Sequence, residues 1–338
     1  MRDLLVVGGG PVGLAAAIGA RLAGLDVTVV EPRPDPVDKA CGEGLMPGAV
    51  DGLHALGVTP AGQPFLGIRY VGPDHQAEAR FRAGSGLGVR RTTLQAALGR
   101  RADELGVDRV RGWATDVSQD GDRVTAAGMS ARWLIAADGL HSPVRRSLGL
   151  ERPAPGSPRF GLRQHFAVKP WTDLVEVHWS GRSEAYVTPV GGGVVGVAVL
   201  CGPGLSFADR LSEFPDLSGR LSGAEPCDDV RGAGPLRQVS AARTKGRVLL
   251  VGDAGGYVDA LTGEGVAVGL ATAAAAVHAV LTGRPEGYER AWRRETRRYR
   301  MLTGLLLRAA QSPRVRPRIV PAASRLPRVF AGAVALLA

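Results

Sequence analysis

The chain has 338 residues and a formal net charge of +10, with 42 Lys and Arg against 32 Asp and Glu. This length allows a large buried core and two structural units. Residues 284–328 hold thirteen Arg, no Lys and three Glu, so this segment carries the whole net charge. Because aromatic residues are sparse there and no recognition motif accompanies the charge, we expect no nucleic-acid binding.

The three cysteines are Cys41, Cys201 and Cys227, and their spacing is not that of metal ligands. An odd number of cysteines fits a reducing cytoplasm, so we expect a cytoplasmic protein without a metal site. The apolar stretch 4–20 has the length of the core of a secretion signal. Its regular glycines, and the α/β pattern that follows, favour a folded segment instead.

The first predicted element is a strand, turn and helix of the kind that binds a dinucleotide. Residues 4–7 are a short, continuously apolar run, which predicts a buried parallel strand, and residues 14–22 have apolar residues at helical spacing. Gly8 permits a tight turn, Gly10 lets the backbone approach a pyrophosphate, and Gly13 lets the helix pack close to the strand. The full turn reads Gly8, Gly9, Gly10, Pro11, Val12 and Gly13.

A second strand, predicted over residues 26–30, ends at Glu31, where an acidic side chain accepts hydrogen bonds from a ribose diol. Arg91 opens a helix predicted over residues 91–104, and residues 133–137 predict another buried strand. From the residues alone, Asp138 is either a cofactor contact or a helix N-cap, and Arg145 with Arg146 is either a contact or a solvated helix start. These residues belong to the stretch Asp138-Gly139-Leu140-His141-Ser142-Pro143-Val144-Arg145.

The longest uncharged stretch runs over residues 185–208 and is interrupted by prolines and glycines. Residues 186–188 and 194–200 therefore predict the two strands of a hairpin, not a membrane span. A second glycine-rich turn follows the apolar run 248–251 and precedes an apolar helix predicted over residues 266–280. Its position predicts that it binds the same dinucleotide as the first turn. It consists of Gly252-Asp253-Ala254 and then Gly263-Glu264-Gly265.

Three of these motifs, in this order, resemble the flavoprotein monooxygenase superfamily, which includes aromatic hydroxylases and geranylgeranyl reductases. The motifs are Gly8-x-Gly10-x-x-Gly13, Asp138-Gly139-x-x-Ser142-x-x-Arg145 and Gly252-Asp253. The match spans residues 1–50, 90–150 and 245–280, roughly half of the chain. The resemblance implies a bound FAD, with NADH or NADPH as the reductant.

The resemblance also implies roles for single residues. Asp253 is expected to hold the ribityl hydroxyls or the adjoining phosphate region, through a charge-assisted hydrogen bond. Gly263 and Gly265 are expected to let backbone N–H groups approach the pyrimidine edge of the flavin, where the N-terminus of the following helix adds positive potential. The stretch that begins at Asp138 braces the pyrophosphate in this superfamily, and Arg91 matches an arginine beside the FAD.

The reaction is less sharply indicated than the cofactor. The segment Lys39-Ala40-Cys41-Gly42-Glu43 resembles the Lys-x-Cys-Gly segment of the reductases, where the cysteine lies near the working face of the flavin. The reductases usually carry Tyr-x-Trp-x-Phe-Pro on the substrate sheet, whereas this chain has Glu184-Ala185-Tyr186-Val187-Thr188-Pro189. A wall bearing Glu184, Tyr186, Thr188 and His178 suits a hydroxylated aromatic ring.

We therefore expect an NAD(P)H-dependent monooxygenase that hydroxylates a hydrophobic or phenolic small molecule. Cys41 and Tyr186 are the candidate catalytic residues, Cys41 as a proton donor or as a group that tunes the flavin. Reduction of a carbon–carbon double bond, as in the geranylgeranyl reductases, is the alternative. A flavin-binding protein without enzymatic activity is a second alternative.

The predicted fold class is α/β, with a Rossmann-like FAD-binding domain and a mostly antiparallel β-sheet substrate domain. The FAD-binding domain is assigned to residues 1–62, 83–157 and 246–285, and the substrate domain to residues 63–82 and 158–245. Residues 286–338 form a basic C-terminal segment.

Within this basic segment, residues 287–300 predict a helix, and prolines break the pattern after residue 312. The apolar stretch 329–338 is too short to span a bilayer. The segment is either a solvated helix whose tail packs over the substrate domain, or a peripheral membrane contact. The sequence leaves the oligomeric state open.

Overall fold

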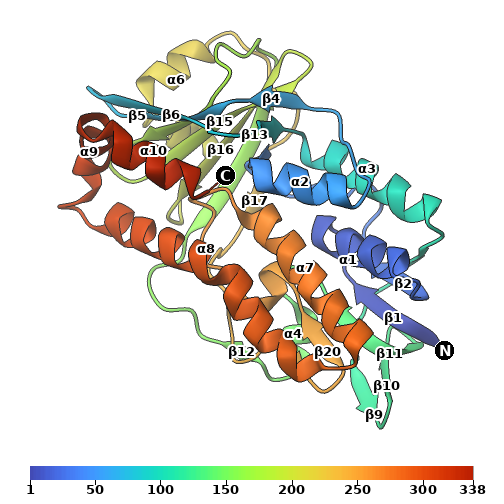
Figure 1. Cartoon of the computed structure of the whole chain (residues 1–338). Helices are drawn as coiled ribbons and strands as arrows, with labels where there is room; N and C mark the ends of the chain where they lie inside the picture. Colours follow the sequence, from blue (N-terminus) through green and yellow to red (C-terminus); the bar gives the residue numbers. More distant parts are fainter. Residues whose placement is uncertain (338) are drawn as a thin grey trace.

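The computed structural model describes residues 1–337 in two large sheets and two small ones, with helices packed around them (Figure 1), and Ala338 lies outside the described residues. The first sheet has the strand order β19-β20-β11-β1-β2-β8, and its strands from β20 to β8 are all parallel. Their bounds are β1 Arg2–Val7, β2 Val27–Glu31, β8 Asp108–Arg111, β11 Met129–Ala136, β20 Val248–Leu250 and β19 Thr244–Lys245.

Helices cover one face of this parallel sheet and a hairpin with a short helix covers the other. On the first face, Ile18, Leu98 and Ala276 lie in one buried core with the strand residues Leu4 and Val6. The helices on that face are α1 Pro11–Leu22, α2 Pro47–Ala55, α3 Arg91–Glu104 and α7 Gly265–Thr282. The opposite face carries β9 Ser118–Asp120, β10 Arg123–Ala126 and α4 Pro143–Ser147. This arrangement confirms the predicted Rossmann-like part of the fold.

The second sheet has seven strands in the order β17-β13-β16-β15-β14-β5-β6. All of its pairs are antiparallel except β14 with β5, which is parallel. The predicted hairpin is confirmed as β15 and β16. The strands are β5 Gly67–Val71, β6 Gln76–Arg80, β13 Phe160–Phe166, β14 Val175–Trp179, β15 Glu184–Gly191, β16 Val194–Cys201 and β17 Arg231–Ala233.

Two of the short strands in the segments assigned to the substrate domain lie outside the seven-stranded sheet. β4 (Gln63–Phe65) pairs with β7 (Gly86–Gly88), which also pairs with β3 (Gly44–Leu45). Residues 244–245 form β19, which turns through Gly246 at φ +59° to pair with β20 in the parallel sheet. Both segments are too short for the hydrophobic pattern to assign them to a sheet. The remaining short elements are β12 Glu151–Arg152, β18 Val239–Ser240, α5 Phe207–Leu211 and α6 Pro215–Arg220.

The basic C-terminal segment begins with one helix that is longer than predicted. α8 (Tyr288–Gln311) continues past residue 300 because its buried face continues at helical spacing, from Trp292 and Tyr299 to Thr303 and Leu307. After Ser312, α9 (Ile319–Arg325) and α10 (Pro327–Ala335) pack against β6 (Figure 1). The Phe330 ring lies 4.8 Å from the Tyr70 ring of β5. The tail thus covers the edge of the seven-stranded sheet.

One helix of the described residues, α7, is long and apolar enough to cross a membrane. Its sequence has another explanation, because it packs against α1, α2 and α8. Thr272 and Ala276, both fully buried, lie on its inward faces. The apolar composition of α7 is therefore that of a core helix.

Candidate functional site

A large cavity open to solvent, called the central cavity below, extends from the two glycine-rich turns to the seven-stranded sheet. Its turn end is lined by Gly10, Pro11, Val12, Arg33, Lys39, Arg91, Gly139, Asp253, Gly263 and Gly265. Its sheet end is lined by Ile68, Tyr70, Val175, Val177, Tyr186, Thr188, Ala198, Leu200 and Leu236. Cys41, Gly42 and Glu43, from the loop before β3, also line it.

The first glycine turn brings the backbone to the cavity because side chains are absent where chain segments meet. A Cβ on Gly8, whose φ is +104°, would overlap the Ala137 carbonyl, and a Cβ on Gly13 would overlap the Gly8 carbonyl oxygen. Gly10 differs, since a Cβ there would meet only Arg91, at 3.5 Å. Gly8 and Gly13 are therefore needed for packing, while Gly10 leaves the wall of the cavity bare.

The two glycine turns meet through the contact between α1 and α7. A Cβ on Gly269 of α7 would overlap the Val12 side chain, and a Cβ on Gly252 would lie 3.2 Å from it. Gly263 has a φ of +69°, in the left-handed region, and α7 begins two residues later at Gly265. Gly10 caps α1 without a side-chain hydrogen bond, so the first N–H groups of that helix are free for a ligand. Both helix N-termini thus border the same cavity.

Three cationic side chains and one acidic side chain lie at the turn end. Arg33, Lys39 and Arg91 line the central cavity together with Asp253. Burial and the charges of Arg33 and Arg91 lower the pKa of Lys39. Burial raises the pKa of Asp253, against the opposing charges of Lys39, Arg91 and Arg145. The net positive charge at this end suits a diphosphate.

Glu31 lies at the end of β2, as predicted, and is buried beneath the first turn. Its Oε2 accepts a hydrogen bond of 2.8 Å from the Gly9 backbone N–H. Its Oε1 pairs with Arg33 Nε at 2.7 Å. Gln95 of α3 holds the same turn by donating to the Gly9 carbonyl oxygen at 2.6 Å. Glu31 therefore fixes the shape of the turn while its carboxylate stays beside the cationic side chain that lines the cavity.

The central motif connects the two glycine turns rather than lining the cavity with its charged groups. Asp138 Oδ2 accepts a hydrogen bond of 3.1 Å from Val144 N–H in α4, and its Oδ1 is buried without a partner among the described residues. Arg145 is fully buried and donates to the Ala254 carbonyl at 3.1 Å and to Gln238 at 2.8 Å. The interpretation of Arg145 as part of a solvated helix start is therefore wrong. The same interpretation fits Arg146, which is exposed.

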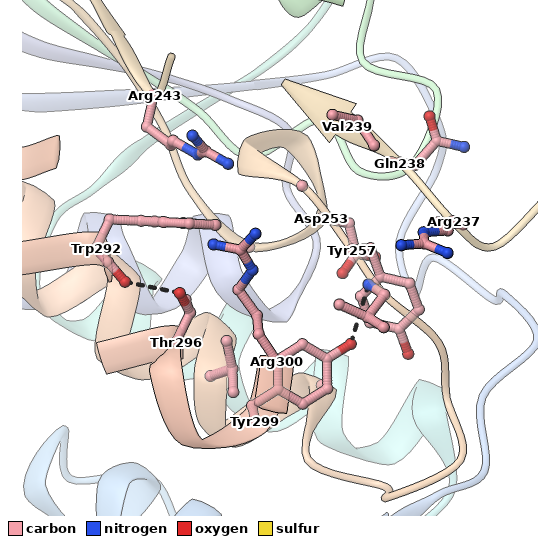
Figure 2. Close-up of a pocket in the computed structure, with 15 residues that line it drawn as sticks. Arg237, Gln238, Val239, Arg243, Asp253, Tyr257, Trp292, Thr296, Tyr299 and Arg300 are labelled. Carbon is pink, nitrogen blue, oxygen red and sulfur yellow. Dashed lines mark hydrogen bonds between the residues drawn. The ribbon is translucent and has the colours of Figure 1, made fainter. Parts of the chain in front are cut away.

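A second, smaller pocket lies behind the turn at Asp253, on the side of α8 (Figure 2). Figure 2 shows the Trp292 ring edge-on, with Arg243 on one side and Arg300 on the other. The Arg243 guanidinium lies 3.9 Å from the centre of that ring, and the Tyr299 hydroxyl accepts from Val258 N–H at 3.3 Å. These contacts hold α8 against the segment that carries the second glycine turn.

Cys41 lies on the wall of the central cavity, and its Sγ accepts a hydrogen bond from the Glu43 N–H at 3.4 Å. Burial raises the pKa of the Cys41 thiol; the charge of Arg91 opposes this and the charge of Glu43 adds to it. Cys41 is therefore a protonated thiol at neutral pH. Thr188 of β15 fixes the same loop by donating to the Gly42 carbonyl oxygen at 2.8 Å.

The polar residues expected on the substrate wall are already bonded within the protein. Tyr186 lines the cavity, but its hydroxyl donates to the Leu261 carbonyl oxygen at 2.7 Å. Glu184 is fully buried between Arg159, at 2.7 Å, and Arg316, at 2.5 Å. His178 is on the opposite face of the sheet from the cavity, paired with Glu176 at 3.2 Å, so its expected position on the substrate wall is wrong. Strand alternation explains this, because Val175 and Val177 of the same strand face the cavity.

The structure brings most of the predicted site residues to one cavity. Gly10, Pro11, Val12, Cys41, Arg91, Tyr186, Asp253, Gly263 and Gly265 line it. Gly8, Gly13, Glu31, Asp138 and Gly252 lie directly behind that lining and support it.

Several residues of the site were not found from the sequence. Lys39 and Glu43 flank Cys41 in the segment that resembles the reductases. Their closeness to Cys41 in the sequence could therefore have indicated that they belong to the site. Arg33 follows Glu31 by two residues, and nothing in the sequence relates it to the cavity. His165 bonds to both Glu43 and Asp228, and neither His165 nor Asp228 carried a signal, because both come from distant segments.

The residues present fit FAD. The bare Gly10 wall, the uncapped first turn of α1 and the cationic turn end suit a diphosphate. Arg91 Nε is buried without a partner among the described residues, so a donor is available there. The central cavity also has a large apolar end where a flavin ring and a substrate can lie together.

Comparisons with known proteins agree with this fit. Residues 1–199 match the family described as FAD binding domain. Menaquinone reductase from Mycobacterium tuberculosis H37Rv is 30% identical over 302 residues, covering 80% of this chain and 74% of the relative. Rifampicin monooxygenase from Rhodococcus hoagii is 31% identical over 162 residues, covering 43% of this chain and 33% of the relative.

The fold has solved counterparts. The flavin-dependent brominase Bmp2 superposes with a TM-score of 0.84 at 20% identity, covering 99% of this chain and 93% of that one. At this identity the likeness concerns the fold alone. Together with the family match, which spans more than half of the chain, the central cavity identifies the function at a coarse level. The chain belongs to the FAD binding domain family and is an FAD-binding oxidoreductase.

Proposed function

We propose that this enzyme uses NADH or NADPH to reduce a carbon–carbon double bond in an apolar, isoprenoid-like molecule. The observation that carries this proposal is the sheet end of the central cavity, whose lining is mostly aliphatic and where the hydroxyls of Tyr186 and Thr188 are bonded within the protein. A polar substrate would lose hydration there and gain few partners, whereas an apolar chain gains about 25 cal/mol per Å² buried.

The same observation weakens the expectation of a phenol hydroxylase. That expectation rested on Glu184, Tyr186, Thr188 and His178 as partners for a hydroxylated ring. Glu184 and His178 do not line the cavity, and the hydroxyls of Tyr186 and Thr188 donate to backbone carbonyls. The Arg163 guanidinium, which does line it, bonds to Asp228 at 2.8 Å and to Asp38.

The relatives support a reductase in the same way. The match to menaquinone reductase extends over 80% of this chain and so includes part of the substrate sheet. The match to rifampicin monooxygenase covers 43%. A digeranylgeranylglycerophospholipid reductase of Methanothermobacter thermautotrophicus matches over 87% at 28% identity. Two relatives that match most of the chain are therefore named as reductases.

FAD, when bound, supplies hydrogen and a pair of electrons for this reduction. Arg33, Lys39 and Arg91 bind and orient the diphosphate, and the aliphatic wall excludes water. Cys41 holds a proton at its Sγ, since burial keeps the thiol un-ionised at neutral pH. We assign Cys41 the role of proton donor to the substrate carbon that does not receive the hydrogen from the flavin.

Anaerobic reoxidation tests the proposal. Holoenzyme reduced with NADPH or NADH is mixed with menaquinone in detergent without oxygen. The expected result is recovery of the oxidised flavin spectrum and a product heavier by two hydrogens on the isoprenoid chain. Cys41→Ser should slow this step at least tenfold while leaving flavin reduction by the nicotinamide unchanged. Reoxidation without any saturated product would overturn the proposal.

Monooxygenation is the second candidate, favoured by the rifampicin monooxygenase relative. It requires molecular oxygen, so oxygen uptake that depends on an added phenol, with a hydroxylated product, would select it. A flavin spectrum with no turnover of any substrate would instead select a flavin-binding protein without enzymatic activity.

We also propose that the enzyme meets its substrate at an anionic membrane surface. α10 is apolar on two sides: Phe330 and Val334 are buried on the protein, while Val329 is 65% exposed and Leu326 55% exposed on the other side. Arg325 and Arg328 are exposed beside them. An outward apolar helix flanked by arginines complements a bilayer of anionic lipid, with about 1 kcal/mol from each basic residue near the surface.

The position of α10 relative to the cavity gives this contact a purpose, because Leu337, two residues after its end, lines the central cavity. Sedimentation with phosphatidylglycerol vesicles, compared with phosphatidylcholine vesicles, tests the contact. Binding should be lost in the double variant Leu326→Asp, Val329→Asp and kept in Leu205→Asp, which changes a leucine that is 48% exposed in another part of the surface. Absence of vesicle binding by the full chain contradicts the contact.

A further inference from the structure

Three tyrosines line the central cavity, and they differ in what their hydroxyls contact. The Tyr186 hydroxyl donates to the Leu261 carbonyl oxygen at 2.7 Å. The hydroxyl of Tyr257 belongs to the turn end, since a Cβ on Gly265 would lie 3.5 Å from its oxygen. The third tyrosine, Tyr70, lies in the wall of the sheet end.

The Tyr70 hydroxyl has no hydrogen-bond partner within residues 1–337, and no hydrogen bond contributes to its pKa. It is also absent from the buried side-chain oxygens that are unpartnered and closed off from open space. The side chain is partly exposed although its ring packs against a hydrophobic cluster. The hydroxyl therefore reaches open space, and the space that Tyr70 lines is the central cavity.

The alternation of β5 directs Tyr70 into the cavity. Ile68 and Tyr70 both line it, whereas Arg69 between them bonds to Glu176 on the opposite face of the sheet, at 3.0 Å. Tyr70 pairs in register with Val177 of β14, which also lines the cavity. The hydroxyl thus stands at the side of an aliphatic floor.

Neighbouring rings fix the direction of this hydroxyl. The Tyr70 ring lies 5.4 Å from the Trp179 ring and 4.8 Å from the Phe330 ring of α10, both tilted against it. Burial, with the charge of Glu184 adding to it, raises the pKa of Tyr70 well above its ordinary value. The phenol therefore stays protonated at neutral pH, and it is a donor held in place before any ligand arrives.

We propose that Tyr70 binds the substrate, by donating a hydrogen bond from its hydroxyl to a neutral acceptor oxygen such as a carbonyl. This inference rests on the apolar substrate proposed above and adds one required feature, the acceptor oxygen. A hydroxyl in an apolar wall loses hydrogen bonds to water when a ligand covers it, and an acceptor on that ligand restores one. The enzyme should therefore select apolar molecules that carry such an oxygen over plain hydrocarbons.

Two ligands and two variants test this hydrogen bond. Menaquinone has carbonyl oxygens, whereas squalene is an isoprenoid hydrocarbon without oxygen. Their dissociation constants are measured by calorimetry with oxidised holoenzyme in matched detergent micelles. Tyr70→Phe should weaken the binding of menaquinone about tenfold and change that of squalene less than about twofold. Tyr186→Phe, in the same wall, should change both by less than about twofold, because its hydroxyl already has a protein partner.

An infrared measurement separates the hydrogen bond from packing. The carbonyl stretching band of menaquinone should lie at lower wavenumber in the parent enzyme than in Tyr70→Phe, because a donated hydrogen bond weakens the C=O bond. Equal weakening of both ligands in Tyr70→Phe, unchanged binding of menaquinone, or the same carbonyl band in both proteins would overturn the role of Tyr70. So would the absence of menaquinone binding to the parent enzyme.

Both measurements use oxidised enzyme without a reductant, so they do not depend on the proposed reduction. If that reduction is wrong and Tyr70 binds the substrate, menaquinone binds with the shifted carbonyl band but yields no saturated product. If the reduction is right and the role of Tyr70 is wrong, the saturated product forms and Tyr70→Phe binds menaquinone as the parent does.

Discussion

At the turn end of the central cavity, glycines leave the backbone bare, so the backbone itself forms part of the wall. At the sheet end the wall is made of side chains, and the hydroxyls of Tyr186 and Thr188 there bond to backbone carbonyl oxygens. Gly8, Gly10 and Gly13 act through the absence of a Cβ. Glu184, Tyr186 and Thr188 act through bonds to other protein groups. The turn end therefore suits a polar cofactor, whereas the sheet end presents an apolar surface that suits an apolar substrate.

The largest expected effect is at the turn end. Gly13→Ala places a Cβ against the Gly8 carbonyl oxygen, so α1 must move away from β1. We expect a loss of at least about 3 kcal/mol in the free energy of unfolding and purification without flavin. The measurements are the ratio of flavin to protein and urea unfolding. In the control Gly19→Ala, on the same helix, the nearest atom lies at 3.9 Å, so helix propensity should add roughly 1 kcal/mol.

At the sheet end, Glu184→Gln should act on stability rather than on substrate binding. The change leaves the Arg316 guanidinium buried without its carboxylate and weakens the pairing of Arg159, which we expect to cost about 3 kcal/mol. Urea unfolding measures this cost, with the exposed Glu78→Gln as control, expected below about 1 kcal/mol. Unchanged stability with a raised KM would place Glu184 in contact with the substrate after all.

Glu176, on the face of the seven-stranded sheet that points away from the central cavity, is expected to make the stability depend on pH. Burial alone would raise the pKa of Glu176, but hydrogen bonds from His178 and Trp171 lower it to about 2, from an ordinary value of 4.5. The unfolded chain therefore binds this proton more tightly than the native protein. Stability from this group is complete above about pH 4.5 and is lost as the pH falls towards about 2. Urea unfolding should show less of this acid loss in Glu176→Gln; equal acid loss in both proteins would contradict it.

The smallest effect is expected at Tyr186. Tyr186→Phe removes the hydrogen bond to the Leu261 carbonyl, at a cost of about 1 kcal/mol, and leaves the ring in the cavity wall. Turnover of menaquinone should change less than twofold if the hydroxyl has only this structural partner. A large fall in turnover with unchanged stability would instead indicate that Tyr186 is a catalytic residue. The sheet end would then contact the substrate through the Tyr186 hydroxyl, contrary to the comparison above.

The turn end was largely predictable because each of its features is local in sequence. A short apolar run, a glycine spacing and an acidic residue after the next strand indicate a dinucleotide site without knowledge of the packing. The first residues of the helices that begin at Arg91 and Gly265 were also predicted to within one residue, although the second helix ends two residues later than predicted. The roles assigned there to Asp253 and Gly263 stay predictions about the flavin.

The sheet end was not predictable to the same degree. The residues Glu184, Tyr186 and Thr188 alternate along one strand, so their common face was correct, but their partners come from residues 42, 159, 261 and 316. His178 was placed on the wrong face, since the alternation of β14 alone does not say which face meets the cavity. For Arg145 the sequence left a contact and a solvated helix start open, because its partners lie far away in the chain; it is buried and donates to the Ala254 carbonyl.

By itself, the sequence determined that this protein binds a dinucleotide cofactor, and it predicted the two glycine-rich turns as the place, since the absence of a side chain at a fixed spacing is a local property. The tertiary structure decided what lies opposite that cofactor. Hydrogen-bond partners far apart in the chain decide whether a polar residue faces a ligand or another protein group, and here they leave an aliphatic wall. The same long-range contacts assemble Glu43, His165 and Asp228, which no local pattern connects.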